Sequence, residues 1–203
     1  MNNVISIGRE SFLSCSSLTT IDVDWSKVTT IGGNAFSGCV NLVINDLAMS
    51  NLTSISEGAF RNTGVKVVSN MGSITTATGL TGATSLTSVT LPSTVTKIGS
   101  LGFYEATALA NINIPNSLEY IEFKGLAKTA LTSIVLPEGF KCTGESAFAE
   151  NNNLTSLTFP STLTQQWENG TNFVSSNTGL KYLDINAGTG LQTVTIPSNL
   201  DIE

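Results

Sequence analysis

Side chains that could do chemistry are few in this chain, which has three cysteines and fifteen acidic residues but no histidine. Without histidine, the usual general base of a nucleophilic triad is missing, so no serine or cysteine has an evident activator. The chain has no P-loop sequence and no G-x-G-x-x-G motif between a strand and a helix, and no carboxyl group lies in a context that predicts a shifted pKa. The sequence therefore predicts a protein that is not an enzyme and uses no cofactor.

Cys15 and Cys39 end two similar segments, IGRESFLSC and IGGNAFSGC, and so occupy the same position one repeat apart. In a stacked coil their side chains would be near neighbours, as a disulfide or as a ladder of small buried thiols. The ladder is favoured, because free cysteine behaves as a small apolar residue. Other small residues occupy the equivalent position elsewhere: Thr63, Ala106, Thr129 and Asn151. Cys142 stands alone, so the sequence has neither a disulfide framework nor the cysteine spacing of a metal site.

Three carboxylates, Asp22, Asp24 and Asp46, fall on outward positions of the first two predicted strands. They could converge on one edge of a sheet, where several oxygen ligands would suit a calcium ion. A solvated acidic patch that favours solubility is the simpler interpretation, and we favour it. No metal is therefore predicted.

All these side chains lie within a repeating sequence unit of roughly two dozen residues. A segment that starts with Leu or Val and carries further apolar residues recurs nine times, and successive copies begin about 21 to 26 residues apart, except that the last follows after 11. The copies are LTTIDV (18–23), LVINDL (42–47), VKVVSN (65–70), LTSVTL (86–91), LANINI (109–114), LTSIVL (131–136), LTSLTF (154–159), LKYLDI (180–185) and LQTVTI (191–196). A fixed period of this kind predicts a solenoid, in which each unit buries its apolar edge against its neighbours.

The repeat has two halves. In the first half, a short helical turn would place one large apolar side chain between stacked coils. That column comprises Phe12, Phe36, Phe60, Phe103 and Phe148, with Leu126 once. The second half is the recurring segment, whose alternation and richness in Thr, Ile and Val predict a short strand. All five prolines follow such segments, where a strand is expected to stop.

The pattern resembles the bacterial BspA-type leucine-rich repeat, most closely in IGGNAFSGCVNL (31–42) and LTSVTLPSTVTKIG (86–99). The resemblance extends over residues 7 to about 200, with departures at 72–85, which keep only Leu80 at the Phe position, and at 164–179. It implies an α/β repeat fold: a leucine-rich-repeat solenoid with a parallel β-sheet of short strands, and short helical turns or irregular coil on the opposite face. It also implies an extracellular or cell-surface protein that is similar to bacterial adhesins.

The whole chain, 1–203, is predicted to be a single array of about eight to nine units, and we expect it to be a fragment of a longer protein. Its net charge of -6, with nine scattered Lys and Arg, offers no basic patch for nucleic acid. No apolar run is long enough to span a membrane, and no signal peptide is recognisable. The open ends of such an array predict weak end-to-end self-association.

The outward strand positions form the one broad surface available for recognition, and they carry mainly hydroxyl and amide groups. The candidate partner-binding residues are Thr20, Asp22, Asp24, Asp46, Thr90, Asn113, Thr158, Tyr182 and Asp184. We therefore predict a recognition or adhesion module that binds a protein or another surface macromolecule through this face. The alternative is a structural spacer, with binding carried by another domain.

Overall fold

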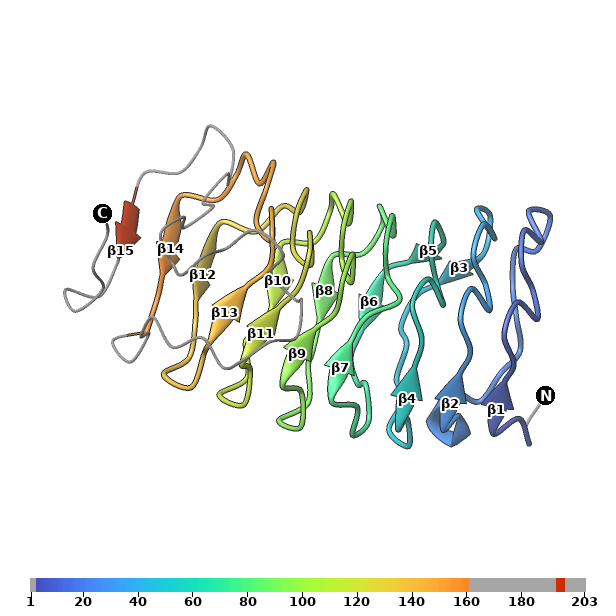
Figure 1. The fold of residues 1–203 in the computed structure, drawn as a ribbon. Coiled ribbons are helices and arrows are strands. Elements are labelled where there is room, and N and C mark those ends of the chain that lie inside the picture. Colours follow the sequence, from blue (N-terminus) through green and yellow to red (C-terminus); the bar gives the residue numbers. More distant parts are fainter. Residues whose placement is uncertain (1–2, 161–192, 196–203) are drawn as a thin grey trace.

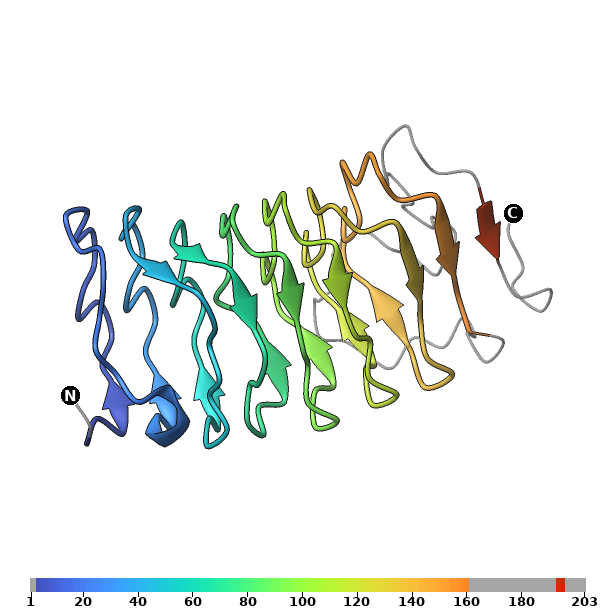
Figure 2. The same cartoon turned by 180° about the vertical axis from the view of Figure 1, so that it is seen from behind.

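The chain winds into an elongated solenoid of stacked coils, seen from two opposite sides in Figures 1 and 2. This computed structural model describes residues 3–160 and 193–195. Each coil contributes short strands that run in the same direction as those of its neighbours. The strands form two rows along the length of the solenoid (Figure 1).

The first row holds one two-residue strand from each of seven successive coils. Its members are β1 (Ser6–Ile7), β2 (Thr30–Ile31), β4 (Ser54–Ile55), β7 (Thr76–Ala77), β9 (Lys97–Ile98), β11 (Tyr120–Ile121) and β13 (Cys142–Thr143). They pair in parallel as β1-β2-β4 and as β7-β9-β11-β13. Ile7, Ile31 and Ile55 stand in register and are buried, so β1, β2 and β4 each add one apolar side chain to a column.

The second row runs beside the first. It comprises β3 (Val43–Ile44), β5 (Gly64–Val65), β6 (Val67–Val68), β8 (Ser88–Val89), β10 (Asn111–Ile112), β12 (Ser133–Val135), β14 (Ser156–Thr158) and β15 (Thr193–Thr195). These strands form three parallel groups, β3-β5, β6-β8-β10 and β12-β14-β15. β5 and β6 follow each other within one coil, separated by residue 66, so the row is interrupted between successive coils only at β10 and β12 among the described residues.

The leucine-rich-repeat solenoid with short parallel strands is confirmed, and the second row corresponds to the strands predicted from the recurring segments within 42–159 and at 191–196. The strand predicted at 180–185 lies outside the described residues. One expectation at the N-terminus is wrong. Residues 18–23 form no strand, so Thr20 and Asp22 lie in irregular coil rather than on a sheet. A backbone hydrogen bond from Val43 N to Thr19 O, 3.1 Å long, ties this segment to the next coil, but β3 pairs with β5 and not with it.

The loops around the Phe column are turns, and no α-helix occurs among the described residues; the short 3-10 helix η1 (Trp25–Lys27) lies elsewhere in its coil. Each of the seven coils places two residues in the left-handed region, which ends any right-handed helix. These pairs are Glu10 and Ser14, Asn34 and Gly38, Gly58 and Asn62, Gly79 and Gly82, Leu101 and Glu105, Lys124 and Lys128, and Ser146 and Glu150. The loop is thus the irregular coil that the resemblance allowed.

Backbone hydrogen bonds continue from coil to coil through these turns. In the first coil, the N–H groups of Glu10, Phe12 and Ser14 donate to the next coil at 3.0, 2.8 and 2.7 Å. The N–H groups between them bond within the turn, as Leu13 does to Glu10 O at 3.1 Å. Alternate N–H groups therefore serve stacking and turn formation, and this satisfies the backbone without a helix.

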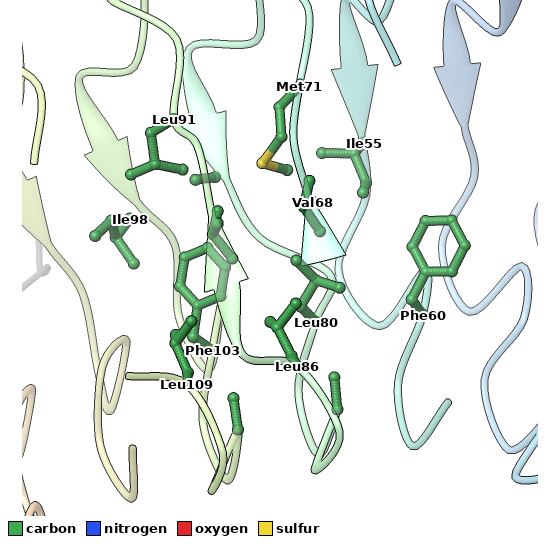
Figure 3. Close-up of a cluster of buried hydrophobic side chains, with 14 of the residues drawn as sticks. Ile55, Phe60, Val68, Met71, Leu80, Leu86, Leu91, Ile98, Phe103 and Leu109 are labelled. Carbon is green, nitrogen blue, oxygen red and sulfur yellow. The ribbon is translucent and has the colours of Figure 1, made fainter. Parts of the chain in front are cut away.

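Stacked aromatic rings fill the N-terminal part of the core. Phe36 lies between Phe12 and Phe60, with ring centroids 4.9 and 5.2 Å away and planes within 10° of parallel. Trp25 is partly buried and packs edge-on against Phe36 and Phe60 at 6.0 and 5.8 Å, so it covers the side of the ring stack. Leu80 occupies the Phe position in the next coil, between Phe60 and Phe103 (Figure 3), and is buried as the sequence predicted.

Replacing Phe36 by alanine is expected to cost ~3–5 kcal/mol of unfolding free energy and to unfold more than its own coil, because the ring is fully buried between two others. Urea denaturation followed by circular dichroism measures this cost. Phe123→Ala is the matched control, since Phe123 is 39% exposed and should lose less than about 1 kcal/mol. Equal losses for the two variants would contradict this assignment of the core.

The N-terminal coil has another described coil on one side only. Phe12, Leu18, Ile21 and Val23 are consequently only half-buried, whereas Phe36 is fully buried. The self-association predicted from the sequence should use this face and should appear as a concentration-dependent rise in mass by light scattering. Leu13→Lys, at a residue 44% exposed on this coil, should weaken it. A strictly monomeric protein at millimolar concentration would contradict the prediction.

Candidate functional site

Outward side chains of the second row form a polar face across the middle of the solenoid. Ser88 is in register with Asn111, and Ser133 with Ser156. All four side chains are at least partly exposed, while Val89, Ile134 and Leu157 between them point into the core. The alternation of inward and outward residues predicted from the sequence is therefore present.

A shallow depression of about 470 Å³ lies on this face. We call it the central depression. It is lined by Ser88, Val89, Thr90, Ala110, Asn111, Ile112, Asn113, Leu131, Thr132 and Ser133. It coincides with the interruption of the row, because its walls come from β8 and β10 on one side and from the start of β12 on the other.

The candidates Thr90, Asn113 and Thr158 all lie on this face. Thr90 and Asn113 line the central depression, and Thr158 is paired in register with Val135 on β12. The Asn113 amide already bridges two coils, since its Oδ1 accepts from Leu91 N at 2.6 Å and its Nδ2 donates to Leu91 O at 2.9 Å. Asn113 therefore fixes the wall of the depression rather than offering a free amide.

The N-terminal acids are not assembled into one site. Asp24 accepts a hydrogen bond from Ser26 at 2.6 Å and pairs with Lys27 at 3.3 Å, and the Ser26 bond lowers the pKa of its carboxyl group. Asp46 instead accepts from the backbone and hydroxyl of Ser69, at 3.1 and 2.8 Å. Asp22 is exposed. Within residues 3–160, no group of three or more His, Cys, Asp or Glu side chains is arranged to hold a metal.

The cysteines are free thiols. Cys39 is fully buried, donates to Phe12 O at 2.9 Å, and has its pKa raised by burial. Cys15 is exposed because no described coil covers that side of it. The interpretation as a ladder of small side chains fits Cys39 and the buried Thr63, Thr129 and Asn151, whereas Cys15 forms its exposed end.

A second group of side chains was missed by the sequence reasoning. We call it the lysine–aromatic ridge; its members are Tyr104, Tyr120, Phe123, Lys124, Lys128 and Lys141. Lys124 Nζ lies 5.2 Å from the Tyr104 ring centre and 5.3 Å from that of Phe123, and Lys141 Nζ lies 5.6 Å from that of Tyr120. The available signal was local: two of the three tyrosines and four of the nine Lys and Arg fall within 97–141.

Ion pairs join three coils beside this ridge. Lys128 pairs with Glu105 at 3.3 Å and with Glu150 at 3.2 Å, one in the coil before it and one in the coil after. Lys97–Glu122 at 3.0 Å and Lys141–Glu119 at 3.1 Å are two further pairs between coils. Hydrogen bonding to Glu150, Tyr104 and Glu105 raises the pKa of Lys128.

Tyr182 and Asp184, the remaining candidates, lie outside the described residues. The described part of the chain contains no helix long and apolar enough to cross a membrane.

Parallel strands, stacked coils and columns of buried Leu, Ile and Phe define a leucine-rich-repeat solenoid with an exposed polar sheet face. A sequence model described as the BspA type leucine rich repeat region matches residues 1–81 and 79–195. The chain belongs to this family. No curated protein sequence matches it.

Solved structures of bacterial leucine-rich-repeat proteins are similar to the chain. One is a leucine rich cell surface protein from Faecalibacterium prausnitzii, with 26% identity and a TM-score of 0.63, in which the match covers 76% of this chain and 42% of that one. Another is the leucine rich repeat protein of T. pallidum, with 23% identity and a TM-score of 0.55. That match covers 76% of this chain and 62% of the T. pallidum chain. The chain thus matches less than two thirds of the length of each, and the second likeness shows the fold alone.

Raising the pH above about 10.5 should destabilise the chain partly through Lys128. Because its pKa is higher in the folded state than the ordinary 10.5, its contribution is complete below that value and is lost as the pH rises through the folded pKa. Thermal unfolding of Lys128→Met should therefore fall less steeply with pH than that of the unaltered protein. Lys66→Met, at an exposed lysine without a described ion pair, is the control and should keep the original slope.

Proposed function

We propose that this chain is a non-enzymatic recognition or adhesion module of a bacterial cell surface, and that it binds a macromolecular partner through the outward face of the second row. The observation that carries the proposal is the exposed polar face of parallel strands with the central depression in it. The cell-surface assignment is supported by family membership and by the likeness to a leucine rich cell surface protein.

The mechanism is shape complementarity over many weak contacts. The described part of this face carries mainly hydroxyl and amide groups, with exposed Val43 and Val135, and lacks aromatic anchors, so no single residue is expected to dominate binding. An individual site would bind weakly, and several copies on one cell would together bind with a much higher avidity than any single site. An adhesin works in this regime, since it acts from a surface that displays many copies.

The alternative is that the array acts as a spacer that holds a binding domain away from the cell. The elongated stack of coils with one shared core supports this alternative, because such a stack can hold two other domains apart. The two functions differ in what they require of the sheet face. A spacer tolerates any exposed substitution that leaves the fold intact.

The test uses surface plasmon resonance with immobilised mucin, collagen and laminin. The unaltered chain should bind at least one of them, and Ser133→Arg should reduce that binding at least roughly ten-fold, because a large side chain blocks the depression. Ser54→Arg, on the exposed side of the first row, is the matched control and should bind normally. Binding that survives Ser133→Arg, or absent binding to every probe, would favour the spacer.

A further inference from the structure

The central depression lies at a break in the main-chain hydrogen bonding of the second row. β10 is the last strand of one group and β12 is the first of the next, so no ladder joins them. The coils remain attached beside the break through the bond from Ala130 N to Leu109 O, 2.9 Å long. The facing edges of β10 and β12 therefore carry N–H and C=O groups that take part in no sheet pairing.

The lining has an unusual chemical composition, because none of its ten residues carries a charge. Its polar side chains carry hydroxyl and amide groups only: the hydroxyls of Ser88, Thr90, Thr132 and Ser133 and the amides of Asn111 and Asn113. Each hydroxyl both donates and accepts, and each amide offers both functions from one side chain. An ionic ligand would find no opposite charge in this lining.

The floor supplies a small apolar area. Ala110 is exposed and Ile112 is half-buried, and both line the depression between the polar positions. The volume of about 470 Å³ falls within the ~300–1,000 Å³ of small-ligand sites, but the site is open and polar where most of those are enclosed and apolar. A ligand that suits it has many hydroxyl groups, some C–H surface and no net charge.

We infer that the central depression binds a neutral saccharide, such as a short segment of an uncharged surface glycan. The sugar hydroxyls would hydrogen-bond to Ser88, Asn111, Ser133 and the main-chain groups at the break, while the C–H face of a ring would rest on Ala110 and Ile112. The inference rests on the proposed function, since it names the chemical class of partner for the same face.

An extended peptide is the other ligand that main-chain groups at a strand edge could bind. Here the edges are short, since β10 has two residues and β12 has three, and each strand is already paired on its other side with β8 or β14. A peptide strand gains affinity from a row of successive backbone bonds, and these edges offer only a few. The saccharide therefore fits the break better.

Saturation-transfer NMR on the full chain tests the inference, with maltohexaose, mannohexaose and a galactan oligosaccharide as neutral probes. Polygalacturonate oligomers and an uncharged Thr/Asn hexapeptide are the comparison probes. At least one neutral sugar should give a signal that persists in about 0.5 M NaCl, because screening does not affect uncharged contacts. A stronger signal from the acidic sugar, lost in salt, would overturn the inference, as would binding of the peptide alone.

The double variant Asn111→Ala/Ser133→Ala should lower the association constant roughly ten- to thirty-fold, as expected for two lost hydrogen bonds. Both residues are exposed, so the fold should survive, and unchanged thermal unfolding verifies this. Asn45→Ala/Ser54→Ala removes one amide and one hydroxyl from exposed positions outside the depression and should bind as the unaltered chain does. If the two double variants bind the sugar with equal affinity, the central depression is not the binding site.

The outcomes separate this inference from the proposed function. If mucin, collagen or laminin binding is lost in Ser133→Arg but no neutral sugar binds, the face is a recognition surface for another chemistry and the saccharide is wrong. If neutral sugars bind in a manner that depends on Asn111 and Ser133, the saccharide stands even where the three immobilised proteins fail to bind. If neither the immobilised proteins nor the neutral sugars bind, both the recognition function and the saccharide site are wrong.

Discussion

The whole structure depends on stacking, because no coil can satisfy its own backbone or bury its own apolar edge. The turn around the Phe column shows this dependence most clearly. Glu10 and Ser14 adopt left-handed conformations, at a cost of roughly 1–2 kcal/mol for each such residue, and their N–H groups bond to the following coil. The strained left-handed residues of one coil therefore donate the hydrogen bonds that join it to the next coil. The stability of the array comes from contacts between neighbouring coils rather than from single coils.

Two different interactions reinforce the stack along its length. In the first three coils the aromatic rings lie face to face, with Phe36 between Phe12 and Phe60. In the fifth to seventh coils, where Leu126 interrupts the Phe column, lysine and glutamate link successive coils, as Lys128 does between Glu105 and Glu150. Ring stacking is insensitive to salt and pH, whereas exposed ion pairs respond to both. The first three coils and the fifth to seventh coils should therefore respond differently to salt and pH.

The apolar columns could be predicted from the sequence because burial repeats with the period; even the substitution of Leu80 for Phe was recognisable. The first row of strands could not be, since two residues such as Thr30–Ile31 are too short to show alternation. The ion pairs require knowledge of which outward positions become neighbours, and coil length varies. The sequence also suggested that Asp24 and Asp46 lie on one edge of a sheet. In the structure Asp24 bonds to Ser26 in its own coil, whereas Asp46 bonds to Ser69 in the next coil.

The break between β10 and β12 shows how a uniform scaffold acquires a distinct place. Where the ladder is continuous, the main-chain N–H and C=O groups are hydrogen-bonded between coils, and only side chains remain for recognition. At the break, main-chain groups outside the sheet pairing lie beside the exposed amide and hydroxyl side chains of the central depression. Asn113 contributes by holding the wall, because its amide bonds to both main-chain groups of Leu91. A local break in the strand ladder, beside a wall that Asn113 fixes, therefore distinguishes this part of the face from the coils around it.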